Sequence, residues 1–273
     1  MREFLAGKYR LPLGERAYVM GILNVTPDSF SDGGRFLDPE KAVCHALEMR
    51  EQGADLIDIG AQSTRPGHTQ ISPDEELARL LPVLKRLQGR LDIPVSVDTF
   101  YPAVALASLT YGVSVINDVT GFDDPGMIEV AARSDCGCIV MHHTGSPDSD
   151  ILTGINLFFA HRIEKMGLAG IGSGRICLDP GIGFGKTHKE NLTVLANSSR
   201  LETGGCALLV AASRKRVIGA ECGNPPFDRR LAGTLAAHSI AIADGADIVR
   251  VHDVPEAVQA AKMAFAIRRY RIG

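Results

Sequence analysis

Eight short apolar runs rich in β-branched residues recur along this chain, and each leads into a polar or glycine-rich turn. They occupy residues 18–25, 55–61, 94–100, 113–121, 136–143, 175–181, 206–213 and 247–254. Most of the intervals between them carry helical patterning, so the chain predicts a parallel sheet with helical crossovers. Eight is also a strand number at which such a sheet closes into a barrel.

An open, doubly wound sheet is the alternative to a closed barrel. Such a sheet usually has fewer strands and a glycine fingerprint after the first one. Here the first run is followed by Thr26-Pro27-Asp28-Ser29, which holds no glycine. A length of 273 residues is normal for an α/β barrel, and the composition shows no shift along the chain. We therefore predict a (β/α)8 TIM barrel in which residues 1–273 form a single domain.

Several local signals predict where helices begin and where a loop lies. Ser72 and Glu75 have the spacing of a capping box with Pro73 at the first helical position, and Thr187 and Glu190 repeat that spacing. The last helix is expected to start near Pro255 and to run to the C-terminus. Residues 145–154 are rich in Ser, Asp and Gly and are expected to form a loop.

Charge and cysteine content limit the class of protein. A net charge of −3, from 29 basic and 32 acidic residues, argues against a general nucleic-acid or membrane-surface binder. The 6 cysteines are scattered without paired C-x-x-C spacing, which favours reduced thiols in the cytoplasm. Residues 1–10 do not have the pattern of a signal peptide, and we find no apolar run of the ~18 residues that span a bilayer.

Polar side chains gather where the predicted strands end, which is where barrels carry their functional residues. Any one of them alone is more often a satisfied polar group or a helix cap, but every predicted strand contributes. They are Asn24; Ser63, Thr64 and Arg65; Asp98; Asn117 and Asp118; His142 and His143; Asp179; Ser213, Arg214, Lys215 and Arg216; and Arg250, His252 and Asp253.

Two of these strand ends invite more specific interpretations. Residues 179–187 resemble a phosphate loop, but Pro180 stands where the Walker pattern needs glycine, so the glycines instead suggest backbone close to a flat ligand. Barrels often bind phosphate after strands seven and eight, and Arg250 and His252 share one side of the last strand. With Asn24 and residues 63–65 they make an anion clamp. His142 and His143 receive no role, because a metal site needs a third ligand that the sequence does not indicate.

Taken together, these segments resemble the dihydropteroate synthase family. The matching motifs span nearly the whole chain in the expected order, and the first and fifth are long and specific. They are MGILNVTPDSFSDGG (20–34), DLIDIGAQSTRPG (55–67), SVDT (96–99), INDVTG (116–121), LDPGIGFGKT (178–187), SRKRVIG (213–219) and RVHDV (250–254).

The resemblance implies a reaction in folate biosynthesis, in which 4-aminobenzoate displaces diphosphate from (7,8-dihydropterin-6-yl)methyl diphosphate to give 7,8-dihydropteroate. It also implies Mg²⁺, a homodimer, small-molecule substrates and inhibition by sulfonamides. No nucleic-acid or membrane partner is expected.

The same resemblance implies roles for individual residues. Asp98, Asn117 and Asp179 match the positions that bind the pterin edge, and Lys215 donates to the pterin. Thr64, Arg250 and His252 match the diphosphate clamp, and Asn24 matches the residue associated with Mg²⁺. Phe30, Pro66 and Phe184 border the aminobenzoate slot, together with the Lys215 stem. Lys215, Asp98 and Arg250 are the expected catalytic residues.

The chain departs from the family pattern at a few positions. Gln62 replaces a common glutamate, residues 143–146 differ from the usual version, and Arg216 stands where some relatives have serine. Two rival functions are a pterin-binding methyltransferase, which should lack the diphosphate clamp, and an inactive pterin-binding homologue, which should have lost one or more site residues. The clamp residues that the first rival should lack and the site residues that the second should have lost are all present in this chain, which argues against both rivals.

Overall fold

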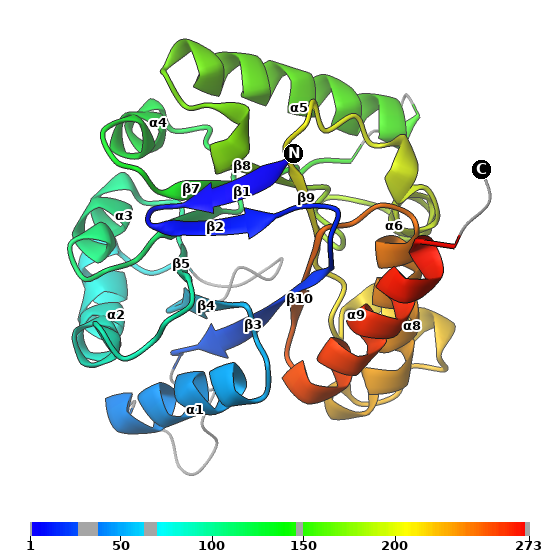
Figure 1. The fold of residues 1–273 in the computed structure, drawn as a ribbon, viewed down its shortest axis with the longest axis horizontal. Helices are drawn as coiled ribbons and strands as arrows, with labels where there is room; N and C mark the ends of the chain where they lie inside the picture. Colours follow the sequence, from blue (N-terminus) through cyan, green and yellow to red (C-terminus); the bar gives the residue numbers. More distant parts are fainter. Residues whose placement is uncertain (1, 27–37, 63–69, 146–149, 271–273) are drawn as a thin grey trace.

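A closed, all-parallel barrel of eight strands forms the centre of the molecule (Figure 1). The computed structural model describes residues 2–26, 38–62, 70–145 and 150–270. Each strand lies within one of the eight predicted runs, and the order around the barrel follows the sequence, with β10 closing onto β3. The predicted (β/α)8 fold is confirmed. The barrel strands are β3 (Tyr18–Asn24), β4 (Leu56–Gly60), β5 (Val95–Asp98), β6 (Val115–Asp118), β7 (Gly137–Met141), β8 (Ile176–Asp179), β9 (Ala207–Val210) and β10 (Ile248–Val251).

Helices connect the strands and surround the barrel (Figure 1). The crossover between β9 and β10 carries two of them, α7 and α8. The α-helices are α1 (Pro39–Glu51), α2 (Pro73–Leu87), α3 (Pro102–Leu109), α4 (Pro125–Ala132), α5 (Ile151–Leu168), α6 (His188–Ala196), α7 (Arg216–Glu221), α8 (Leu231–Ala243) and α9 (Val254–Arg268). Short 3-10 helices are η1 (Ser173–Arg175), η2 (Ser198–Arg200) and η3 (Phe227–Arg229).

The two predicted capping boxes differ in the structure. At the start of α6, the Thr187 hydroxyl accepts from the Glu190 backbone N–H at 3.2 Å, and the Glu190 carboxylate accepts from the Thr187 N–H at 2.6 Å. At the start of α2, the Ser72 hydroxyl accepts from the Glu75 N–H at 3.2 Å, but the Glu75 carboxylate pairs with Arg79 one turn further on. The prediction is therefore confirmed for α6, whereas α2 has only the one-way cap.

The predicted loop at residues 145–154 is too long. Residues 146–149 lie outside the described part of the chain, but Asp150 already caps α5, which begins at Ile151. The Asp150 carboxylate accepts from the Thr153 N–H at 3.1 Å, so the Ser, Asp and Gly content partly reflects a helix start. The last helix, α9, begins at Val254, close to the predicted position.

An antiparallel hairpin of β1 (Glu3–Ala6) and β2 (Tyr9–Pro12) lies across the amino end of the barrel (Figure 1). The hairpin is not among the predicted elements, because each of its strands has only 4 residues and shows little periodicity. Phe4 is fully buried, and a Cβ at Gly137 would lie 2.7 Å from the Phe4 ring, so only glycine fits at the start of β7. The hairpin closes the floor of the barrel.

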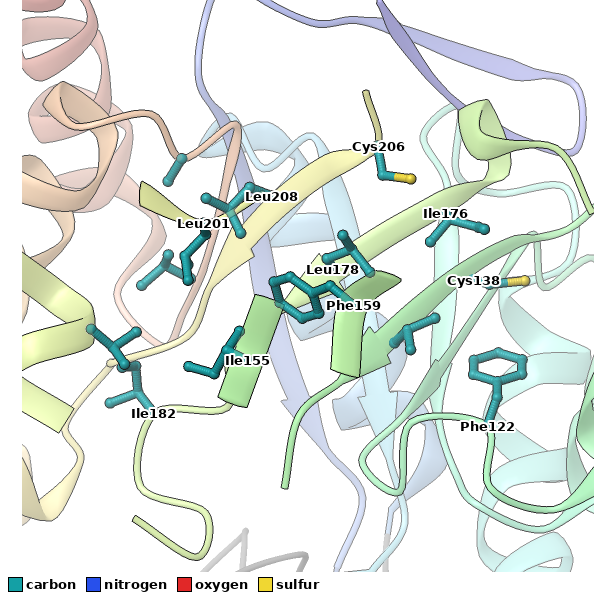
Figure 2. Packing of buried hydrophobic residues seen from close by; sticks show 14 of the residues in the cluster. Phe122, Cys138, Ile155, Phe159, Ile176, Leu178, Ile182, Leu201, Cys206 and Leu208 are labelled. Carbon is teal, nitrogen blue, oxygen red and sulfur yellow. The ribbon is translucent and has the colours of Figure 1, made fainter. Parts of the chain in front are cut away.

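In the part of the chain that the structure describes, three hydrophobic clusters make up the core. One fills the barrel interior at its amino end and includes Phe4, Met20 and Leu56. The other two lie between the outer face of the barrel and the helices. Figure 2 shows part of one of them, in which Phe159 of α5 packs near Leu178 of β8. Strands with apolar side chains on both faces are the pattern expected of a parallel sheet covered by helices.

Within the described residues, no helix combines the length and hydrophobicity needed to cross a membrane.

Candidate active site at the carboxyl end of the barrel

The barrel interior changes from apolar to polar along its axis. Side chains alternate between the two faces of a strand, so Leu56 and Asp58 of β4 both point inward, and the same holds for Val115 and Asn117 of β6. The strand register sets Asn24, Gly60, Asp98 and Asn117 side by side in one layer. Of the predicted strand-end residues in the first half of the barrel, Asn24, Asp98 and Asn117 are therefore brought together, whereas Ser63, Thr64 and Arg65 lie outside the described residues.

Arg250 is an inward-facing residue of β10 and joins two carboxylates in this layer. Its Nε donates to Asp58 Oδ2 at 2.6 Å, and its Nη2 donates to Asp98 Oδ2 at 3.0 Å. The Asn117 amide also donates to Asp58 Oδ2, at 3.0 Å. Asp58 is fully buried and Asp98 is 5% exposed, so these bonds lie in a water-poor site where electrostatic interactions are strong. Burial raises the pKa of Asp98, while the charge of Arg250 opposes that rise.

Asp179 ends β8 on the opposite side of the site. Its Oδ1 accepts from the Gly181 N–H at 2.7 Å, and the residue is 4% exposed. Gly181 has φ +68°, and a Cβ there would lie 1.9 Å from the His142 carbonyl oxygen, so this turn requires glycine. Burial raises the pKa of Asp179, and Lys215 opposes it. The buried Asp179 carboxyl is thus positioned by a backbone conformation at Gly181 that only glycine can adopt.

Lys215 reaches the same space from the loop after β9. Its Nζ donates to the Ile182 carbonyl at 2.5 Å and lies 4.7 Å from the centre of the Phe184 ring. Burial lowers the pKa of Lys215 to about 8, and Asp179 and Asp98 act against this decrease. Phe184, Asp179 and Lys215 are therefore brought together, as the sequence predicts.

The glycine loop after β8 is held by Lys186. Its Nζ donates to three carbonyl oxygens: that of His142 at 3.0 Å, that of Gly181 at 3.1 Å and that of Phe184 at 3.3 Å. Asn191 of α6 adds a second support, because its Oδ1 accepts from the Gly183 N–H at 2.6 Å. Burial lowers the pKa of Lys186 to about 8.

His252 follows β10 and has its imidazole oriented by a neighbour. Its Nδ1 lies 2.9 Å from the Ser213 hydroxyl, and its ring meets Phe227 edge-on at 5.3 Å. The neighbouring basic segment is partly committed to structure, since Arg214 Nε donates to Asp253 at 3.0 Å. Residues 213–216 are therefore not a uniform charged surface.

Asn24 ends β3 and is half-buried. A Cβ placed on Gly60 would lie 3.9 Å from Asn24 Oδ1 and 3.5 Å from Asp98 Cβ, so Gly60 leaves room between these side chains. An amide oxygen is a hard donor that suits Mg²⁺, which usually takes one or two protein ligands together with phosphate oxygens and water. Asn24 fits such an ion. The other candidates of this side, Phe30, Thr64 and Pro66, lie outside the described residues.

His142 and His143 directly follow β7. The described residues contain no group of three or more His, Cys, Asp or Glu side chains arranged to hold a metal ion. Burial lowers the pKa of His142 to about 3, and its ring meets Phe158 edge-on at 5.1 Å. His143 lies 3.7 Å from Asp123.

Three features of the site were missed by the sequence analysis. Asp58 lies in the middle of an apolar strand, and a lone acid in such a strand was the available signal of a buried partner. Lys186 belongs to the glycine-rich motif but was treated only as part of a failed phosphate-loop match. The pairing of Gln62 with Glu76 joins residues 14 positions apart, and nothing in the spacing indicated it.

A cavity of about 510 Å³ lies at the opposite end of the barrel. It is lined by the hairpin turn, the end of α2 and the starts of β5, β6 and β7, and includes Tyr9, Leu87, Val95 and Val113. None of the candidate site residues contributes to it. The polar layer, rather than this cavity, is the candidate active site.

The fold and polar layer define a class, which comparison with known proteins confirms: residues 20–252 match the pterin binding enzyme family. A dihydropteroate synthase of Clostridium beijerinckii is 43% identical over 266 residues, covering 96% of this chain and 98% of the relative. The chain belongs to the dihydropteroate synthase family and is an enzyme of that family.

Solved structures agree with this assignment. A Xanthomonas albilineans dihydropteroate synthase with 4-aminobenzoic acid has a TM-score of 0.88 and 41% identity, covering 94% of this chain and 95% of that one. The Burkholderia cenocepacia enzyme, complexed with 7,8-dihydropteroate, has a TM-score of 0.88 and 37% identity, covering 98% and 97%.

Proposed function

We propose that the polar layer at the carboxyl end of the barrel is where this chain joins 4-aminobenzoate to the pterin diphosphate. The family's reaction is the condensation of (7,8-dihydropterin-6-yl)methyl diphosphate with 4-aminobenzoate to give 7,8-dihydropteroate and diphosphate. The observation that carries the assignment is the convergence of Asp98, Asn117, Asp179, Lys215 and Arg250 from five parts of the chain at the carboxyl end of the barrel interior, where the first three are buried and the other two half-buried.

Asp98, Asn117, Asp179 and Lys215 hold the pterin ring in this proposal. A pterin presents N–H donors at its 2-amino group and ring nitrogens, next to a carbonyl acceptor. Buried carboxylates accept from those donors, while the Lys215 ammonium donates to the carbonyl. Asp98 Oδ1 has no hydrogen-bond partner among the described residues, which leaves a buried acceptor ready for a ligand donor.

The diphosphate side consists of Asn24, Thr64, Arg250 and His252. The guanidinium of Arg250 already bridges Asp58 and Asp98, which fixes its place below the pterin layer. Asn24 would hold Mg²⁺ together with diphosphate oxygens, and the bound ion would supply charge neutralisation to the leaving group. His252, oriented by Ser213, donates to the diphosphate.

The bond-making step requires alignment more than acid–base chemistry. The amine nitrogen of 4-aminobenzoate forms a bond to the methylene carbon, the carbon–oxygen bond breaks, and diphosphate leaves with the electron pair. The proton lost from the amine goes to water. Phe184 and the Lys215 stem border the aromatic slot, and the match to the family motif gives Phe30 and Pro66 the same role in this proposal. The residues contribute by orienting the two substrates and stabilising charge on the leaving group.

Asp179→Asn tests the proposal most directly. The change turns one buried acceptor oxygen into a donor facing a ligand donor, which should weaken pterin binding by about 2–5 kcal/mol. Calorimetry of a pterin without phosphate measures this loss, and Asp74→Asn on the exposed start of α2 is the matched control. Near-native affinity in folded Asp179→Asn would show that Asp179 does not bind the pterin. The activity itself would be rejected if the wild-type chain released no diphosphate from the pterin diphosphate in the presence of 4-aminobenzoate.

We also propose a homodimer in the cytoplasm, with the chain acting as one domain. The outer faces of α8 and α9 expose Ile240, Met263 and Ile267, and Tyr270 just after α9 is exposed as well; Met263 is 63% exposed. Four of the six free cysteines are buried thiols, as is usual in a reducing compartment such as the cytoplasm.

Met263→Lys tests the proposed dimer. It should yield monomers in light scattering, and an unchanged mass would exclude the exposed face of α8 and α9 as the interface.

A further inference from the structure

Glu76 is an acidic side chain of α2 that faces the barrel rather than solvent. It is fully buried, although Asp74 and Glu75 beside it on the same helix are exposed. Its Oε2 accepts from the Gln62 amide at 2.9 Å, and the Thr99 side chain also faces the carboxyl. Gln62 follows β4 and Thr99 follows Asp98 of β5, so this one carboxyl ties α2 to the ends of two strands of the site.

The Gln62–Glu76 contact leaves two buried oxygens without a donor. Neither Gln62 Oε1 nor Glu76 Oε1 has a hydrogen-bond partner among the described residues. An ionised carboxylate cannot correct this, because it only accepts. A proton on Glu76 Oε1 would turn one of these acceptors into a donor, and Gln62 Oε1 is the unpaired acceptor on the side chain to which Glu76 is already bonded. Together the two bonds would make the ring that a carboxylic acid forms with a primary amide.

We propose that Glu76 is a positioning residue that carries a proton in the working enzyme and locks α2 to the end of β4 as an acid–amide pair with Gln62. The inference rests on the proposed function only where it concerns activity. The pairing itself is a property of the folded chain.

The surroundings of Glu76 favour the neutral form. Burial raises its pKa to about 7, and the bonds from Thr99 and Gln62 oppose the rise less strongly. The charged or titratable groups that face it are Arg79 on its own helix, Asp98 on β5 and Tyr101 after β5. Arg79 is partly engaged elsewhere, since it donates to the Ala61 carbonyl at 3.0 Å and to Glu75.

A neutral Glu76 has a direct consequence for the pterin layer. A negative charge on Glu76 raises the pKa of Asp98, as does the charge of Asp58. A proton on Glu76 removes that charge and therefore favours the anionic form of Asp98, which accepts from Arg250. Ionisation of Glu76 would break the acid–amide ring and add a second negative charge beside Asp98.

Glu76→Gln imitates the protonated state, because an amide pair keeps both hydrogen bonds at every pH. We expect its kcat/KM at neutral pH to lie within about threefold of the wild type, whereas Glu76→Leu, which leaves Gln62 unpaired, should lose at least about tenfold. The wild type should also lose activity on the alkaline side at a lower pH than Glu76→Gln does. Glu75→Gln is the matched control on the exposed face of the same helix.

Infrared difference spectroscopy provides a readout that needs no substrate. The wild type at neutral pH should show the C=O band of a buried protonated carboxyl, lost in Glu76→Gln and retained in Glu75→Gln. Absence of that band, or a Glu76→Gln variant as impaired as Glu76→Leu, would overturn the proposal. If both variants and the wild type lack activity but the band is assigned, the proposed function fails and the pairing stands.

Discussion

The two sides of the site are each held by an ionisable group largely withdrawn from solvent, half-buried Lys186 and fully buried Glu76, but with opposite hydrogen-bond arrangements. On the β8 side, Lys186 has three carbonyl oxygens around its ammonium, so the charged form is the one that is satisfied. On the β4 side, Glu76 has the Gln62 amide and the Thr99 side chain as partners, and Glu76 Oε1 and Gln62 Oε1 remain unpaired unless Glu76 takes a proton. Burial favours the neutral form in both, moving the pKa of Lys186 down to about 8 and that of Glu76 up to about 7.

This difference shows that burial alone does not decide whether an ionisable group is satisfied in its charged or its neutral form. The cost of withdrawing the Lys186 ammonium from water is offset because it donates to backbone carbonyls, which are abundant in a tight glycine loop. Glu76 faces side-chain partners instead, and those partners match an acid better than an anion. The loop after β8 should therefore depend on a charge, and the end of β4 on a proton.

Removing the Lys186 ammonium should have the largest effect. Lys186→Met removes the ammonium from three carbonyl oxygens, of which, among the described residues, only that of Gly181 keeps another donor, the Phe184 N–H. This should destabilise the fold by about 4 kcal/mol and lower kcat/KM at least about tenfold through loss of the Phe184 position. Denaturant unfolding measures the first effect, and Lys189→Met on the exposed start of α6 is the control. A loss equal to that of the control would show that the loop holds itself together.

The difference in free energy of unfolding between the wild type and Glu76→Gln should change with pH, by slightly less than the loss expected for Lys186→Met. The pKa of Glu76 in the folded state, about 7, lies above its ordinary value of 4.5, so its favourable contribution is complete below 4.5 and is lost as the pH rises to about 7. The variant should accordingly gain about 3 kcal/mol on the wild type across that interval. A pH-independent difference in urea unfolding would mean that Glu76 ionises normally.

The helix caps should give the smallest effects, and they compare the same two sides. Thr187→Ala removes half of a reciprocal box at the start of α6, whereas Ser72→Ala removes a one-way cap at the start of α2. We expect losses of about 1.5 and about 0.7 kcal/mol respectively. Thermal unfolding of both variants gives the order, and a larger loss for Ser72→Ala would contradict the structural difference.

The sequence allowed the barrel and most of the site to be predicted for one physical reason. Parallel strands bring their carboxyl ends to one edge, so Asp98, Asn117 and Asp179 could be placed together without knowing any distance. Asp58 escaped because its partners Arg250 and Asn117 come from distant strands, and only the closed barrel brings them together. Glu76 was not predicted as part of the site because it is one of three consecutive acids at a helix start, and only the folded structure shows that it alone is buried.

The floor of the barrel has a consequence for the order in which the chain can assemble. Arg2, at the base of the hairpin, donates to Asp247 at 3.1 Å and to the Cys206 carbonyl at 3.2 Å, and β3 pairs with β10. During synthesis these early residues leave the ribosome long before their partners exist. The inner cluster around Met20 must therefore stay uncovered until nearly the whole chain has emerged, which makes ring closure a late, non-local event.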